Sequence, residues 1–325
     1  SLGNTVAPQD VIDKHGADVL RLWVVGSDYA EDLRIGPEII KQQADVYRRF
    51  RNTLRYLLGS LHGFEAGERL PREQMPELER WVLHRLAQLD GQLREACASL
   101  QFHGFFSELH GFCAVDLSAF YFDVRKDALY CDPVDTVRRR AARTVLDTLF
   151  DCLTAWLAPF LCFTAEEAWL IRHPGEDESV HLRTFPDIPA DWRDEVLAGR
   201  WAVVRRLRRV VTGALELARA GKRIGSSLQA HPMVWATAEY RDAVAGLDLA
   251  ELAITSAAAF ADGDPPADAF TLPDVSGVAV RVDLAAGQKC ERCWQVLPDV
   301  GRHPVHATLC GRCVDAVDSH RAAAE

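Results

Sequence analysis

Apolar residues recur at steps of three and four through most of the first 220 residues, and this spacing places them on one face of an α-helix. The pattern is clearest from Val82 through Leu86, Leu89 and Leu93 to Leu100. The same spacing predicts further helices over residues 10–25, 45–61, 102–121 and 137–156. Pro159 ends or kinks the last of them. Residues 45–190 are therefore predicted to form an antiparallel helical bundle.

Short sequence motifs predict where the helices of this bundle begin and where a linker separates them. The Gly- and Pro-containing stretch Gly63–Pro76 predicts a linker between two helices. Thr164–Glu167 has the order of a capping box and predicts the start of a short helix that runs through Trp169. The aromatic residues of 102–121 are interpreted as core rather than as a platform for stacked bases.

The pattern changes after about residue 190. A long helix is expected over 192–221, with its apolar residues inward. These are Val196, Val203, Leu207, Val210, Ala214 and Leu217. Short strands are then expected at Met233–Ala236, Leu252–Thr255 and Val278–Leu284, with a helix at Ala238–Gly246. The acidic stretch Asp262–Asp268 predicts a mobile loop. The segment 191–286 is thus predicted to be a long helix followed by a small α+β unit.

The distribution of charged residues along the chain bears on whether it binds nucleic acid. The net charge of −10 argues mildly against binding to nucleic acid. Between Arg193 and Arg223, however, nine Lys and Arg residues face only three acids. Smaller arginine clusters lie at 48–55 and 138–143. Such clusters either contact phosphates or solvate a helix face, and the sequence leaves both possibilities open.

Compartment and membrane topology follow from simpler features. Charged residues such as Asp10, Asp13 and Lys14 interrupt any apolar run near the start, so no signal peptide is expected. The longest nearly apolar run, Ala155–Phe163, is about half of what a membrane span needs. These features predict a soluble cytoplasmic protein with no membrane partner. Five scattered cysteines are expected to be small buried hydrophobes in a reducing compartment. They are Cys97, Cys113, Cys131, Cys152 and Cys162.

The other four cysteines carry the strongest chemical signal. Cys290 and Cys293 form one CxxC pair, and sixteen residues later Cys310 and Cys313 form a second. This spacing is typical of a tetrahedral zinc ribbon, and four thiolates leave no open position on the metal. We expect one structural zinc, whose removal unfolds roughly the last thirty residues. Two disulfides or a redox pair are the alternatives, but they require an oxidising compartment or a βαβ setting.

The sequence is similar to the bacterial-type isoleucyl-tRNA synthetases, a class I family, at several separate points. Lys289–Trp294 resembles the zinc signature of that family, and Arg51–Gly59 resembles the opening helix of its anticodon-binding bundle. Later bundle helices and the junction that leads to the zinc domain are matched by Val115–Asp123 with Lys126 and Asp127, Ala158–Trp169, Ala214–Arg219 and Ile224–Leu228. Cys162 stands where the family pattern has Pro, a minor departure.

The resemblance extends to the first residue. Ser1–Asn4 resembles the tail of the KMSKS loop, with Ser1 as its final serine, and this loop holds ATP phosphates in the family. The preceding lysines, the HIGH motif, the nucleotide-binding fold and the editing domain lie outside this sequence. His62-Gly63 and His110-Gly111 are interpreted as bundle residues. The resemblance thus implies ATP and Mg²⁺ only for a longer enzyme, and no isoleucine activation by this chain alone.

The resemblance implies that the chain binds the anticodon arm of tRNA(Ile) and is monomeric. Candidate contacts are Arg205, Arg208, Arg209, Arg219, Lys222, Arg223, Arg292 and Trp294. Trp294 is expected to pack over the zinc loop or to stack on a nucleotide. The predicted divisions are 1–44 (signature-loop tail and connective segment), 45–190 (bundle), 191–286 (long helix and α+β junction) and 287–325 (zinc ribbon).

Two hypotheses of other classes remain. DNA glycosylases of the formamidopyrimidine type resemble the same CxxC-x16-CxxC ending, but they would need a β-sandwich before it. A helical scaffold with zinc as a staple would bind no RNA.

Overall fold

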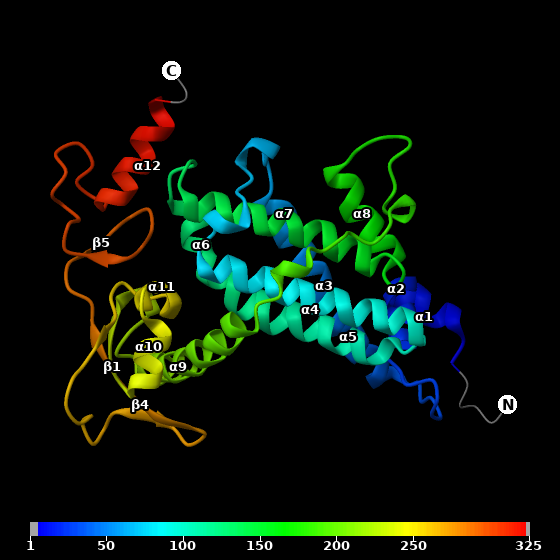
Figure 1. The fold of residues 1–325 in the computed structure, drawn as a ribbon, viewed down its shortest axis with the longest axis horizontal. Helices are drawn as coiled ribbons and strands as arrows, with labels where there is room; N and C mark the ends of the chain where they lie inside the picture. The colour runs from blue at the N-terminus through cyan, green and yellow to red at the C-terminus, as the bar shows by residue number, and fades with distance from the viewer. Residues whose placement is uncertain (1–5, 323–325) are drawn as a thin grey trace. The chain divides into compact units, whose positions relative to one another are not determined.

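The computed structural model describes residues 6–322 (Figure 1). The fold is mainly helical, with a small sheet and a four-cysteine cluster, as the sequence predicts. Two compact units form within it. Unit 1 comprises the described residues through Phe122 together with Arg140–Arg193, and unit 2 comprises Asp123–Arg139 and the described residues from Asp194 onward. The divisions at residues 44, 190 and 286 stay a prediction.

Unit 1 is a helical bundle. In Figure 1, α4 and α5 run alongside each other, and α3 contacts both α2 and α8. Phe50, Leu86, Tyr121 and Trp156 are fully buried between the helices, so the apolar faces predicted from the sequence do form the core. The elements are α1 (Pro8–His15), α2 (Ala17–Val25), α3 (Pro37–Ser60), α4 (Glu77–Ser99), α5 (Phe102–Gly111), the π-helix η3 (Phe112–Tyr121), α7 (Val137–Leu157, from Arg140) and α8 (Cys162–Arg172).

Three helix predictions need correction. The helix expected over 10–25 is two helices, because Gly16 adopts a φ of 88°, which a helix cannot contain. The helix expected from residue 45 begins at Pro37, where proline suits the first turn. Residues 102–121 are helical, but their second half is a π-helix. In that stretch Asp116 pairs with Arg85 of α4 at 3.0 Å.

The capping box predicted at Thr164–Glu167 is wrong, because α8 begins two residues earlier. The first turn is capped instead by Asp18 of α2, which is buried. Its carboxylate accepts hydrogen bonds from the Thr164 amide at 2.8 Å and from the Thr164 hydroxyl at 2.7 Å. Glu166 accepts from the amide of Val180 rather than closing a local box.

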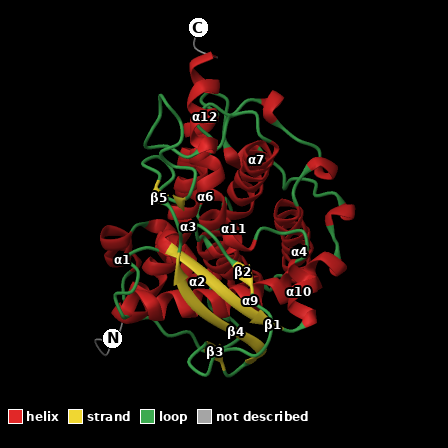
Figure 2. Cartoon of the chain, turned by 90° about the vertical axis from the view of Figure 1, so that its left-hand side faces the viewer, coloured by secondary structure: helices red, strands yellow, loops and turns green. Residues whose placement is uncertain are grey.

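Unit 2 centres on a four-stranded sheet of order β2-β1-β4-β3. The long strands β1 (Ala230–Ala236) and β4 (Val275–Leu284) are antiparallel and appear as neighbouring arrows in Figure 2. Strand β2 (Ala259–Phe260) joins β1 in parallel, and β3 (Phe270–Leu272) pairs with β4. The long helix α9 (Glu195–Ala220) contacts β4, β1 and β3. Two short helices, α10 (Ala238–Val244) and α11 (Leu249–Ala253), complete the predicted α+β unit.

Two details of unit 2 differ from the sequence analysis. The strand expected at Leu252–Thr255 is the end of α11, where Ile254 adopts a left-handed conformation with φ 57°. On α9, Val196 and Leu217 are exposed, although the sequence analysis places them inward. Trp201, Val204, Leu207 and Val210 are among those that form the buried face.

None of the helices within residues 6–322 combines the length and the apolar composition that a membrane crossing would require.

Candidate zinc centre and RNA-binding residues

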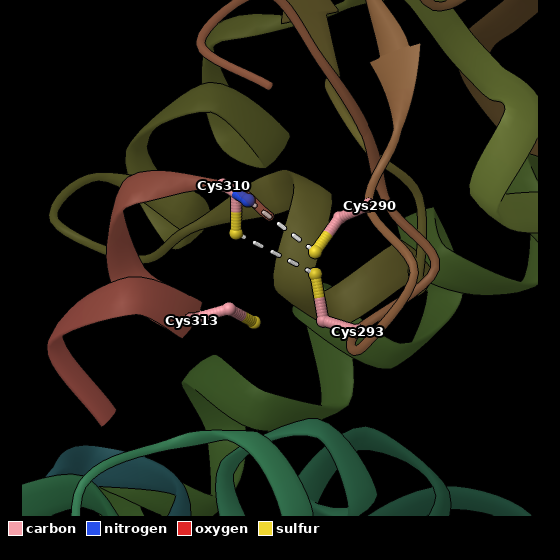
Figure 3. Close-up of side chains that lie close together, drawn as sticks. All are labelled: Cys290, Cys293, Cys310 and Cys313. Carbon is pink, nitrogen blue, oxygen red and sulfur yellow. Dashed lines mark hydrogen bonds between the residues drawn. The ribbon is translucent and has the colours of Figure 1, made fainter. Parts of the chain in front are cut away.

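The four paired cysteines converge from two short knuckles (Figure 3). Cys290 and Cys293 lie on the turn between β5 (Gln288–Lys289) and β6 (Val296–Leu297). Cys310 and Cys313 lie at the start of α12 (Gly311–Ala322). Gly287, with a φ of 116°, permits the hairpin, because a Cβ there would come within 2.2 Å of the Leu297 backbone.

The cluster has the dimensions of a zinc site. All four Sγ atoms are buried and lie within 4.8 Å of one another. The Sγ atoms of Cys293 and Cys310 are 3.8 Å apart. Four sulfurs about 2.3 Å from a tetrahedral zinc would be separated by about 3.8 Å. A disulfide would bring two sulfurs to about 2.05 Å, and all four cysteines are free thiols. The donor set therefore fits zinc, as the sequence predicts.

Local hydrogen bonds favour the thiolate form of one of the four cysteines. Burial raises the pKa of the Cys290 thiol, but backbone N–H groups of Cys293, Cys310 and Arg292 outweigh it and hold the pKa at about 6. The Cys310 amide lies 3.4 Å from this sulfur. Burial raises the pKa of Cys310 itself to about 11. A thiolate ligand is therefore favoured at one position, and metal binding displaces the remaining protons.

The ribbon is anchored to the segment Asp123–Arg139 of the same unit, here called the α6–α7 corner, where α6 (Phe122–Cys131) ends and α7 begins. Arg292 donates to the carbonyls of Cys131 at 2.5 Å and Tyr130 at 3.1 Å. The same guanidinium lies 3.6 Å from Sγ of Cys313. Arg292 thus joins the last carbonyls of α6 to the thiolate cluster, where positive charge is favourable at both ends.

A second arginine reinforces this anchor. Arg312 pairs with Asp127 and, at 3.1 Å, with Asp132, both on the α6–α7 corner. Burial lowers the pKa of Arg312, but its hydrogen bond and charge pairing with Asp127 more than compensate and raise it. Cys131, one of the scattered cysteines, is buried in the same cluster as the four ligands. The sequence analysis missed this contact, because Cys131 and Arg292 are 161 residues apart.

The basic residues of α9 are largely engaged within the protein. Arg208 is half-buried and donates to the carbonyl of Leu252 at 2.7 Å, and burial lowers its pKa. Arg209 is exposed and pairs with Asp274. Arg205 is half-buried. The local excess of basic residues therefore overstates the charge that this helix presents to solvent.

The candidate residues between 219 and 223 likewise include side chains that pair within the protein and one that does not. Arg219 pairs with Glu216 at 2.5 Å one turn away. Arg223 donates to the carbonyl of Val282 on β4 at 2.5 Å. Lys222 is exposed and has a left-handed backbone with φ 57°. Lys222 makes no ion pair or side-chain hydrogen bond among the described residues, so its charge is open to solvent.

Trp294 is displayed at the surface of the ribbon rather than packed over it. The residue is 61% exposed and adopts a φ of 67°, which is unusual for an aromatic residue. Its amide donates to the carbonyl of Cys290 at 2.9 Å, so the knuckle itself imposes this conformation. Nζ of Lys289 lies 5.5 Å from the centre of the ring. The ATP-loop candidate Ser1 lies outside the described residues.

Matches to known families cover three parts of the chain. Residues 79–234 match the anticodon-binding domain of tRNA ligase. Residues 287–316 match a zinc finger found in formamidopyrimidine glycosylases and isoleucyl-tRNA synthetases, and residues 1–36 match the class I tRNA synthetases for isoleucine, leucine, methionine and valine. A helical anticodon-binding domain together with a four-thiolate zinc finger defines a class I aminoacyl-tRNA synthetase.

Similar proteins narrow this class. The chain is 56% identical to the isoleucine–tRNA ligase of Ruegeria pomeroyi over 316 residues, which are 96% of this chain and 32% of that protein. Identity to the ligases of Mesorhizobium japonicum and Gluconobacter oxydans is 54% and 51%, over 96% and 98% of this chain and 32% of each relative. The chain belongs to the isoleucine–tRNA ligase family, and it spans about a third of the length of these curated relatives.

A solved structure is also similar in part. It is the ternary complex of Agrobacterium radiobacter K84 agnB2 LeuRS with tRNA and LeuAMS, which matches 59% of this chain and 22% of that chain. The TM-score is 0.46 and the sequence identity is 17%. The glycosylase hypothesis is excluded by the anticodon-binding match and by the identity to ligases over nearly the whole chain.

Proposed function

We propose that this chain binds the anticodon arm of tRNA(Ile) for an isoleucine–tRNA ligase. In that enzyme, ATP-dependent activation of isoleucine would be coupled to charging of the tRNA. The observation that carries the proposal is the match of residues 79–234 to an anticodon-binding domain, in a chain 56% identical to such a ligase. Phosphate contacts would position the RNA, and unstacked bases would supply specificity.

The positions of the arginines refine which side chains would contact RNA. Arg209, Arg219 and Lys222 remain candidates, since exposed ion pairs contribute little and exchange readily for a phosphate. Arg208 and Arg292 are proposed to act by holding unit 2 together, because buried carbonyls accept from both. Trp294 and Lys289 present a ring and a cation on one surface of the ribbon, which suits stacking on a base.

Binding of tRNA(Ile) transcript by the 325-residue chain tests this function. We expect affinity to fall by orders of magnitude over a modest rise in salt, because each phosphate contact releases a counterion. Substituting Arg209→Gln, Arg219→Gln and Lys222→Gln together should reduce the salt slope by about 3. Arg281→Gln, on the sheet, is the matched control. No binding at low salt would favour the scaffold hypothesis. An unchanged salt slope would show that the RNA does not contact these residues of α9 and the turn after it.

The chemistry of activation is proposed to lie outside this chain. Activation needs groups that orient ATP and isoleucine and that offset charge on departing pyrophosphate, with Mg²⁺ as the expected metal. The chain offers Ser1 alone from the phosphate-binding loop, and a zinc with four thiolates has no open position. Isoleucine-dependent pyrophosphate exchange by the chain alone should be at background. We further propose that the chain is monomeric and cytoplasmic.

A further inference from the structure

A cavity of about 310 Å³ lies within unit 2, close to the zinc cluster but distinct from it. Four segments distant in sequence form its walls: the α6–α7 corner, Leu228 before β1, α11 with the turn that follows it, and the ribbon. The volume lies at the lower end of the range of about 300–1,000 Å³ typical of small-ligand pockets. The space therefore suits one small group rather than an extended chain.

The charges around this cavity nearly balance. Three arginines and three acids form one network, in which Arg138 pairs with Glu251 and Asp132 at 2.8 Å each. Arg125 also pairs with Glu251, at 2.6 Å. The network consists of Arg125, Arg138, Arg312, Asp127, Asp132 and Glu251. Asp248, which also lines the cavity, adds one unmatched negative charge, so the cavity does not attract a phosphate. A neutral ligand fits best.

Most polar side chains that line the cavity are already used. Asp248 caps α11 by accepting from the Ala250 amide at 2.9 Å. The hydroxyl of Ser256 donates to the carbonyl of Leu228 and accepts from the amide of Val296. The hydroxyl of Thr255 donates to the carbonyl of Ala257 at 2.9 Å.

Gln295 is the exception among the lining residues. Its side-chain amide makes no hydrogen bond within residues 6–322, although its backbone carbonyl accepts from Cys290. An amide of this kind offers donors and an acceptor side by side, and it would match the edge of a nucleobase. Val124, Leu228, Ile254 and Leu297 add apolar surface for the faces of a ring.

Backbone strain also gathers around this cavity. Ile254 on its wall and Trp294, which precedes Gln295, both adopt a left-handed backbone. This conformation is unfavourable for β-branched and bulky residues, and such strain persists where the surrounding structure enforces it. The left-handed turn at Trp294 leaves the ring outside, while the next residue lines the cavity.

We propose that this cavity receives one unstacked base of the anticodon arm and that Gln295 recognises its edge. The inference rests on the proposed function. It is supported by the anticodon-binding match, which includes the lining residues Val124, Asp127, Arg138 and Leu228. Outside the cavity, exposed Trp294 would stack on a neighbouring nucleotide. Sequence-specific RNA recognition commonly uses such extruded bases.

A thermodynamic cycle tests this proposal with the 325-residue chain. Its binding to tRNA(Ile) transcripts is measured with an abasic site at each anticodon-loop position in turn, for the parent chain and for Gln295→Ala. Gln295→Ala should weaken binding of the intact transcript about tenfold, with an unchanged salt slope because no phosphate contact is lost. One abasic position should weaken parental binding to a similar degree and weaken the variant no further. Such non-additivity identifies the contacting pair.

Leu228→Trp, which fills the cavity, should weaken binding of the intact transcript to a similar degree. The same abasic position in the RNA should then weaken binding to this variant no further. Zinc content and thermal unfolding of both variants check that unit 2 remains folded. If the parent binds and the losses from Gln295→Ala and every abasic site simply multiply, the proposal is overturned while the proposed function stands. Tight binding of a free nucleoside monophosphate that does not compete with the RNA would also overturn the proposal, because the cavity would then be a separate nucleotide site. Failure of the parent to bind tRNA would instead reject the proposed function.

Discussion

Arg208 on α9 donates a hydrogen bond to the carbonyl of Leu252, whereas its neighbour Arg209 extends to the surface. The two side chains are adjacent and chemically identical, so their roles depend only on position. A charged hydrogen bond in a half-buried setting contributes more than an exposed pair, because the freed carbonyl would lose its partner. Arg208 is therefore assigned to stability and Arg209 to the surface charge.

This difference predicts different costs of truncation. Arg208→Ala should lower the free energy of unfolding of unit 2 by about 1.5–3 kcal/mol. Arg209→Ala, whose pair is 52% and 66% exposed, should lower it by less than about 1 kcal/mol. Chemical denaturation followed by circular dichroism measures both values. Equal costs for the two variants would contradict the assignment.

At the scale of elements, the start of α8 depends on a partner far away in sequence. Leu161 at its N-cap has no side chain that can accept a hydrogen bond, and Asp18 of α2 supplies the acceptor instead. A capping carboxylate also interacts favourably with the positive end of the helix dipole. The contact between α2 and α8 therefore contains a specific hydrogen-bonded pair in addition to apolar packing.

Asp18→Ala should therefore destabilise unit 1 by about 1–2 kcal/mol, the usual cost of losing a cap. Hydrogen exchange should accelerate at the amides of Phe163 and Thr164, which point at this carboxylate. Asp45→Ala, which removes an exposed carboxylate paired with Arg48 on α3, is the matched control and should change stability little. Unchanged exchange at both amides would show that Asp18 does not cap α8 in solution.

At the scale of the whole molecule, the zinc site stabilises more than its own loop. Arg292 and Arg312 join the ribbon to the α6–α7 corner through carbonyls, carboxylates and a cysteine sulfur. Metal binding and folding are coupled in sites of this kind. The sequence analysis predicted that loss of zinc would unfold only the last thirty residues or so. Because of these contacts, we expect residues 123–139 to lose structure as well when zinc is removed.

We predict about one zinc per chain, which is lost on chelation or when Cys290 and Cys293 are replaced by serine. Hydrogen exchange followed by mass spectrometry should then show faster exchange in the ribbon and in the α6–α7 corner. Helices α3, α4 and α5 of unit 1 should retain their protection. Two disulfides without zinc would reject the metal site. Unchanged protection of residues 123–139 would limit the effect to the ribbon.

Much of this protein is determined by local sequence. The three-to-four spacing of apolar residues defines the helices of unit 1, since helical periodicity requires no distant partner. The two CxxC pairs define the metal, because a knuckle is a local turn that aims two sulfurs at one point. Short motifs such as Lys289–Trp294 indicate the family, and the matches confirm it.

The tertiary structure decided what each charged or polar side chain does. Sequence spacing cannot tell that Arg208 meets Leu252, that Asp18 caps α8, or that Arg292 reaches the end of α6. The cavity beside Gln295 likewise exists only where four distant segments meet. The physical reason is range: helix and knuckle formation act over a few residues, whereas burial and ion pairing act between surfaces that folding brings together.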